Sequence, residues 1–159
     1  MADNYSGNFF EIDFRGHEEA MRLIETQTVL LSKNIETAIA RTVLFGIARI
    51  ANDCPVDTGR LRASITGSLA RRAGVDLDGD PQAIAEGRSQ STTMFNKYQG
   101  RIGTSIEYAL YQEYGVRGRF EGRAFFRNNL PLIENYFNQQ MDGAIQATRE
   151  GRLLREGGG

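Results

Sequence analysis

The sequence contains very few of the residues that build disulfides and metal sites: one cysteine, Cys54, and one histidine, His17. A single cysteine excludes a disulfide framework and a cysteine-based zinc site within the chain, and it is typical of a reducing compartment. A single histidine excludes a histidine-pair metal site and most Ser-His or Cys-His dyads. We therefore expect no metal and no cofactor.

Long hydrophobic runs are also absent. No stretch approaches the roughly 18–20 apolar residues that cross a bilayer, and the first 16 residues lack the basic patch and apolar core of a signal peptide. The net charge of −1 gives no overall attraction to nucleic acid or membrane. With 40% hydrophobic and 25% charged residues over 159 positions, the chain is expected to form one soluble globular domain.

Helical periodicity dominates the N-terminal part of the chain. Within an arm over residues 1–16, alternating apolar and polar residues at 10–14 predict a short strand. From about 18 to 52, apolar residues recur every three or four positions, which predicts one long amphipathic helix. Gly46 inside it would allow close packing against another backbone, and Pro55 would end it because the residue before a proline avoids helical angles.

An Asp-Thr-Gly triplet follows this helix. In acid proteases such a triplet carries a catalytic aspartate, but that chemistry needs two aspartates that share one proton. Here the triplet precedes Arg60 and follows a proline, so we favour a structural corner that holds the end of the long helix against the first core strand. Asp57 or Thr58 would cap a short helix over 60–64. The proposed turn residues are Pro55, Asp57, Thr58, Gly59 and Leu61.

The middle of the chain is expected to supply the rest of a sheet. We predict a strand at 65–70 that pairs with a second strand at 102–106, and a long loop or mobile hairpin over 71–100, with a candidate strand near 94–98. The acidic run at 76–80 has neither the glycine nor the glutamate that a calcium-binding EF-hand loop requires, so we interpret it as a solvated loop.

The C-terminal part is again helical. A short helical turn over 107–114 would end at Gly115, and a long helix would run from about Phe125 or Asn129 to Arg149. Residues 151–159 are expected to form a flexible tail. Together these elements predict a single α+β domain over residues 17–150, with a small antiparallel β-sheet flanked by a long N-terminal helix and a C-terminal helix.

Arginines and tyrosines mark the candidate contact surfaces. The arginines would solvate loops or make salt bridges, or they would contact a partner subunit, paired there with Glu107, Glu113 or Glu121, or the phosphates of DNA without sequence preference. The tyrosines favour packing or a subunit contact over base stacking. No combination of residues assembles an active site, so we expect a protein that is not an enzyme. The candidate arginines are Arg60, Arg62, Arg71, Arg72, Arg117 and Arg119, and the tyrosines are Tyr108, Tyr111 and Tyr114.

Three segments in order resemble the tail-component family of long-tailed bacteriophages, typified by gene product ten of the lambdoid phage HK-ninety-seven. They read "CPVDTGRLRASI" at 54–65, "IGTSIEYALYQEYG" at 102–115 and "GRAFFRNNL" at 122–130. Two departures are visible: Arg123-Ala124 replaces the usual Ala-Arg-Pro order, and the segment at 71–100 is long.

The resemblance implies a role in virion assembly. It implies a neck or tail-completion protein that joins the head connector to the tail tube, with a fold similar to that of tail terminators and a homo-oligomeric ring, naturally a hexamer. Its expected location is the virion, assembled in the cytoplasm of a host bacterium. The tail terminator or head-closure ring itself, and a small nucleic-acid-binding module, remain alternatives. The candidate subunit-interface residues are Tyr108, Tyr111, Glu113, Tyr114, Phe125 and Phe126.

Overall fold

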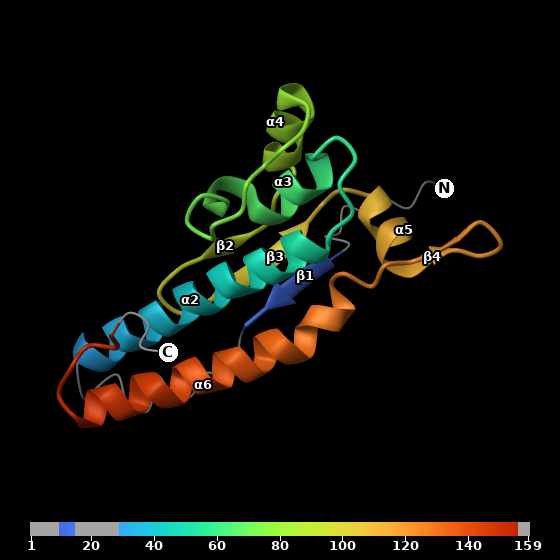
Figure 1. Cartoon of the computed structure of the whole chain (residues 1–159). Coiled ribbons are helices and arrows are strands. Elements are labelled where there is room, and N and C mark those ends of the chain that lie inside the picture. The colour runs from blue at the N-terminus through green and yellow to red at the C-terminus, as the bar shows by residue number, and fades with distance from the viewer. Residues whose placement is uncertain (1–9, 15–28, 156–159) are drawn as a thin grey trace, which may run out of the picture.

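Two long helices run side by side along the length of the molecule (Figure 1). Helix α2 spans Val29–Asp53 and helix α6 spans Leu130–Arg149. The computed structural model describes residues 10–14 and 29–155, so the predicted start of the N-terminal helix lies outside the described residues. Within these ranges, both long helices that the apolar spacing predicts are confirmed.

A three-stranded antiparallel sheet packs against α2. Its strands, in spatial order, are β1 (Phe10–Asp13), β3 (Gly100–Thr104) and β2 (Met94–Phe95). The Arg101 guanidinium on the central strand lies 2.8 Å from the Glu11 carboxylate and 3.6 Å from that of Asp13, so it ties β1 to β3. All three of these strands were predicted, although their ends are shifted.

The segment after α2 is helical rather than extended. Helix α3 spans Arg60–Thr66 and continues into a 3-10 turn, η1, at Gly67–Leu69. The Ser64 hydroxyl donates to the Leu61 carbonyl at 2.7 Å, a bond that a residue makes within a helix. The predicted strand at 65–70 is therefore wrong. It would have paired with β3, but β1 and β2 already occupy both edges of that strand.

Residues 71–100 contain a helix, α4, at Pro81–Ser89. Asp80 caps it, because its carboxylate accepts a hydrogen bond from the Ala83 amide at 2.8 Å, and the proline occupies the first turn, where it is tolerated. The helix packs closely on α3 at Gly87, where a Cβ would overlap a backbone oxygen of α3. The prediction of one long loop or mobile hairpin over this segment was wrong.

After β3 the chain forms a short helix and a projecting hairpin (Figure 1). Helix α5, Tyr108–Tyr114, ends at the glycine that the sequence indicated. Strands β4 (Gly115–Val116) and β5 (Phe120–Glu121) pair with each other and not with the main sheet, and their ribbon extends away from α3 and α4. A 3-10 turn, η2, at Arg127–Asn129 then leads into α6.

The hydrophobic core lies where α2, α3, β3 and α6 meet. Gly46 of α2 makes this contact close: a Cβ there would overlap the Ile102 side chain and lie 3.2 Å from Cδ1 of Ile133. The glycine therefore admits side chains from the sheet and from α6, rather than a second backbone as expected. The predicted α+β class, a small antiparallel sheet flanked by a long N-terminal helix and a C-terminal helix, is confirmed. The largest fully buried side chains include Ile39, Ile47, Ile50, Ile65, Ile102, Phe125 and Ile133.

Beyond α6 the chain turns back onto α2. Asn34, which is fully buried on α2, donates to the Thr148 hydroxyl at 2.9 Å and to the Arg152 carbonyl at 3.0 Å. Its side-chain oxygen accepts a bond from the Leu154 amide at 2.8 Å. These bonds attach the described part of the tail to the helix, which differs from the flexible tail that the sequence predicts.

Candidate interaction surface

The Asp-Thr-Gly triplet forms a tight corner between α2 and α3. Gly59 has a φ of 82°, in the left-handed region that favours glycine. A Cβ on it would lie 2.8 Å from the Asp78 carbonyl oxygen. The Thr58 carbonyl accepts a hydrogen bond from the Asp80 amide at 3.1 Å. The corner therefore rests on the backbone that leads into α4, and not on a strand as the sequence suggested.

The predicted side-chain cap of α3 is absent. Gly59 occupies the capping position, and no side chain makes a capping bond there. The Thr58 hydroxyl lies 3.5 Å from the Arg60 amide, which is long for a hydrogen bond. Asp57 is exposed. The corner is thus set by the backbone conformation of the glycine, with the exposed Asp57 beside it.

A surface cleft of ≈ 290 Å³ opens beside this corner and joins it to α5. Arg60 forms part of its wall. Its guanidinium is held there because Nε and Nη2 both donate to Oε1 of Gln90, at 3.1 and 2.8 Å. Burial raises the pKa of Tyr108 above its ordinary value, so its phenol stays a protonated donor at neutral pH. The cleft is lined by Pro55, Asp57, Thr58, Gly59, Arg60, Leu61, Tyr108 and Gln112.

Glu113 ties α5 to the start of η2, the turn that leads into α6. Its fully buried carboxylate accepts hydrogen bonds from the Phe126 amide at 2.9 Å, the Arg127 amide at 3.0 Å and Arg127 Nε at 2.9 Å. The Arg127 guanidinium also lies 4.4 Å from the centre of the Tyr114 ring. Because Glu113, Phe125 and Phe126 are all buried within the chain, they hold its own core together. This corrects the expectation that these three residues face another subunit.

The base of the β4–β5 hairpin is fixed by the backbone around Glu113. The Ala124 amide donates to the Glu113 carbonyl at 3.1 Å, and the Arg123 amide donates to the Gln112 carbonyl at 2.8 Å. Ala124 has a φ of 49°, a left-handed conformation that costs a non-glycine residue roughly 1–3 kcal/mol. This strained residue stands where the sequence departs from the Ala-Arg-Pro order. The hairpin is therefore held in one orientation although its strands have two residues each.

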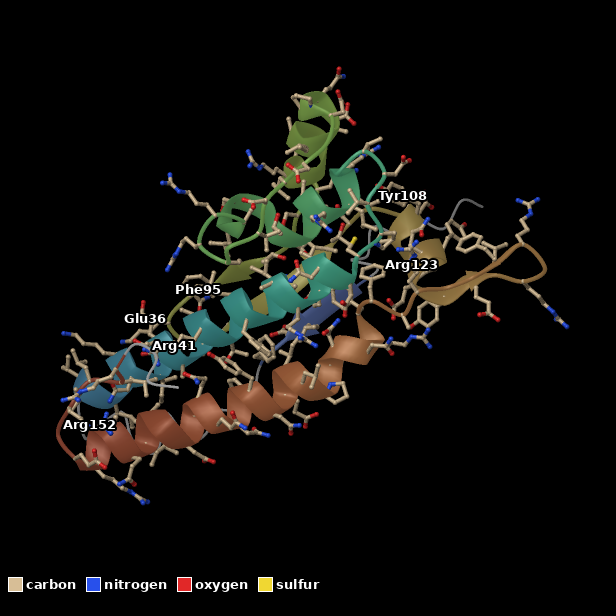
Figure 2. All side chains as sticks on the ribbon, viewed as in Figure 1. Glu36, Arg41, Phe95, Tyr108, Arg123 and Arg152 are labelled. Carbon is tan, nitrogen blue, oxygen red and sulfur yellow. The ribbon has the colours of Figure 1, made fainter. Side chains whose placement is uncertain are left out.

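Exposed aromatic residues run from the cleft along α5 to the hairpin. The exposed fractions are 37% for Tyr108, 53% for Tyr111, 57% for Tyr114 and 45% for Phe120. Figure 2 shows Tyr108 and Arg123 at the end of the molecule that carries α5. Tyrosine and arginine are enriched at the centres of protein interfaces. The three tyrosines predicted as interface residues are thus exposed on one side of the molecule, whereas Phe120 had not been singled out by its spacing.

The candidate arginines divide among several places. Arg60 lies in the cleft wall, and Arg62 is half-buried in α3. Arg71 and Arg72 lie after η1, where the Arg72 guanidinium stands 5.2 Å from the centre of the Phe95 ring. The remaining two are exposed on the hairpin loop. Arg117 and Arg119 thus lie together on the exposed hairpin loop, and the exposed Arg71 and Arg72 adjoin each other in the turn after η1.

Cys54 is buried in the core at the end of α2, with 3% of its surface exposed. Burial raises the pKa of its thiol to about 12, despite the opposing positive charges of Arg62 and Arg123. At neutral pH the side chain is a thiol that packs as a small hydrophobic group. Over residues 10–14 and 29–155, no group of three or more His, Cys, Asp or Glu side chains could hold a metal ion.

Comparisons with family models, with curated proteins and with solved structures gave no match to this chain. No helix in the described part of the chain is both long and apolar enough to cross a membrane.

Proposed function

We propose that this chain is a structural virion protein of a long-tailed bacteriophage, a neck or tail-completion component that joins the head connector to the tail tube. It would act as a ring of its own copies, with six as the working number, and contact the head-closure, tail-terminator or tail-tube proteins beside it. Assembly would take place in the cytoplasm of the host bacterium.

One observation carries this proposal: the chain fixes a projecting hairpin in place and exposes aromatic and arginine side chains along it. Exposed aromatics next to arginines are the composition of interface centres. Buried contacts around Glu113 anchor the base of the ribbon, which extends away from α3 and α4 with exposed side chains. Such a part is suited to binding a neighbouring protein.

The placement of the resembling segments supports the same proposal. The corner at 54–65 and helix α5 at the end of 102–115 line one cleft. Glu113 in the second segment binds the backbone of Phe126 in the third, 122–130. Three stretches that are separate in sequence thus form one continuous region, which includes the hairpin base.

The test is to locate the chain in particles. Lysates of a host that carries the surrounding phage genes would be fractionated, and mature virions examined by mass spectrometry and cryo-electron microscopy. We expect the chain in the purified particles, with density for a ring between head and tail. Its absence from mature virions would refute the proposal. Density in the layer next to the tail tube or next to the head would instead identify it as the tail terminator or head-closure ring.

A nucleic-acid-binding module is the second candidate, and Arg117 and Arg119 on the exposed hairpin favour it. A protein of that class would bind duplex DNA as an isolated chain, with an affinity that falls steeply as salt rises. Binding that is weak and unaffected by exchanging these arginines for glutamine would remove this alternative.

A further inference from the structure

The tip of the β4–β5 hairpin is an unpartnered contact element. Arg117, Arg119 and Phe120 are exposed there, and within the described ranges no ion pair joins either arginine to a carboxylate. A two-stranded ribbon is only marginally stable alone. Here, however, hydrogen bonds at Glu113 and Ala124 anchor its base. The fold therefore presents, on an anchored base, a tip with two positive charges and one aromatic ring.

A complementary surface lies elsewhere on the same chain. We call it the acidic corner and define it as Asp57, Asp78 and Asp80, which are all exposed. The bond between the Asp80 amide and the Thr58 carbonyl holds these residues close together. None of the three makes an ion pair within the part of the chain that the structure describes.

The cleft of ≈ 290 Å³ adjoins the acidic corner through Asp57, the corner residue that lines it, while Arg60 lines it as well and bonds to Gln90. Its wall includes the apolar side chains of Pro55 and Leu61 and the ring of Tyr108, and Asp57 forms part of its rim. Small-molecule pockets begin near about 300 Å³, so the space is ample for one aromatic side chain. Charged and apolar features thus occur side by side here, as they do on the hairpin tip.

We infer that the hairpin tip of one copy inserts into this cleft on a second copy, with Phe120 in the cleft and Arg117 and Arg119 against the acidic corner. A copy cannot fill its own cleft, because its hairpin extends away from α3 and the corner (Figure 1). The two surfaces carry opposite charges on a chain whose net charge is only −1, which favours attraction between copies.

This contact is heterologous, since a tip meets a cleft and not another tip. Each copy has one of each, so the contact can repeat from copy to copy and close into a ring. The inference rests on the proposed function for its place in a virion and deepens it by naming the two surfaces that join neighbouring subunits.

Charge exchange tests the contact. The full chain would be studied by sedimentation velocity at low and high salt, as wild type, as R117E/R119E and as D57K/D78K. Wild type should self-associate, and each double variant should associate at least about 100-fold more weakly, because like charges then face each other. Two samples are decisive: the variant with all four changes, and the 1:1 mixture of the two double variants. In the first, a glutamate tip meets a lysine corner. In the second, each tip meets an oppositely charged corner on the other variant, so association should return in both.

Two further variants complete the test. F120S should weaken association about 30-fold, the equivalent of about 2 kcal/mol at 1.4 kcal/mol per tenfold change, because an aromatic anchor is lost. R149E/R155E is the matched control, since it makes the same change in charge on exposed residues at the last residue of α6 and in the tail beyond it, and it should associate as wild type does. Unchanged circular-dichroism melting would show that each variant is folded.

Three outcomes would overturn the inference: a monomeric wild type at its limit of solubility, no rescue in the four-fold variant and the mixture, or equal weakening by the control. The inference would also be overturned if the chain binds duplex DNA in a salt-dependent way and R117E/R119E abolishes this binding but leaves self-association unchanged. The tip would then be a DNA-binding element. Failure here with the chain present in virions would leave the proposed function standing. If association is rescued but the chain is absent from virions, the contact between copies would stand and the proposed function would be refuted.

Discussion

Replacing Glu113 with alanine tests whether this buried carboxylate organises the region around the hairpin. In the native fold it accepts three hydrogen bonds, from the amides of Phe126 and Arg127 and from the Arg127 guanidinium. Alanine removes every acceptor at once. The backbone amides of Phe126 and Arg127, at the start of η2, then lose their acceptor.

The magnitude follows from these contacts. Each buried donor left without an acceptor costs about 1–3 kcal/mol. Two backbone amides lose their acceptor together, whereas the half-exposed Arg127 guanidinium can bind water instead. We therefore expect Glu113→Ala to lower the free energy of unfolding by about 4 kcal/mol. For a chain of this size, 1 kcal/mol corresponds to about 2–4 °C in Tm. The expected fall is thus about 8–16 °C.

Urea unfolding followed by circular dichroism would measure this loss, with two variants as controls. Glu113→Gln keeps the shape and one oxygen but turns an amide group toward a donor, so we expect about half the loss. Arg127→Ala removes a side chain that is 50% exposed and should cost about 1 kcal/mol or less. A loss below about 1 kcal/mol for Glu113→Ala, or an equal loss for Arg127→Ala, would refute the reasoning.

Three other changes follow from the packing. Gly59→Val should destabilise the chain by about 3 kcal/mol or more in urea unfolding, because a left-handed φ and a close Asp78 carbonyl oppose a branched side chain. Gly87→Ala should cost about 1–3 kcal/mol, since its Cβ would overlap the Arg60 carbonyl and separate α4 from α3. Cys54 should resist iodoacetamide at pH 8 in the folded chain and react fully in urea, because its thiol, with a pKa of about 12, stays protonated and buried.

Each of these changes has a control that should behave differently. Gly74→Ala shares the left-handed φ of Gly59 but has nothing within 4 Å, so it should cost only the backbone strain. Gly143→Ala in α6 would place its Cβ in ordinary contact, 3.4 Å from Leu154, and should stabilise the chain by up to about 1 kcal/mol. Equal effects at Gly59 and Gly74, or at Gly87 and Gly143, would contradict the packing argument. Rapid alkylation of folded Cys54 would contradict its burial.

The thiol also makes stability depend on alkaline pH. The pKa of Cys54 rises from an ordinary value of 9.0 to about 12 in the fold, so the folded state holds the proton more tightly. This contribution is fully present below about pH 9 and declines as pH rises from 9 towards 12. The free energy of unfolding of Cys54→Ala should therefore fall less steeply than that of wild type over this range.

The sequence by itself determined the elements whose signals are local. Apolar residues spaced by three and four predict α2 and α6, and alternation at 10–14 predicts β1, because each pattern reflects a face that must be buried. Gly115 is also a local signal: it ends α5 because its φ of 79° is a conformation that favours glycine. One local signal was missed: Asp80 before Pro81 is a helix start, and it would have indicated α4 within the supposed loop.

Only the tertiary structure decided the state of residues whose partners are distant. The segment at 65–70 is apolar enough for a strand, but it is helical because β1 and β2 already pair with β3. Glu113 resembles a surface residue in sequence, yet it is buried because amides 13 and 14 positions later require an acceptor. No periodicity encodes such a pairing, since its energy exists only once the chain has brought the two segments together.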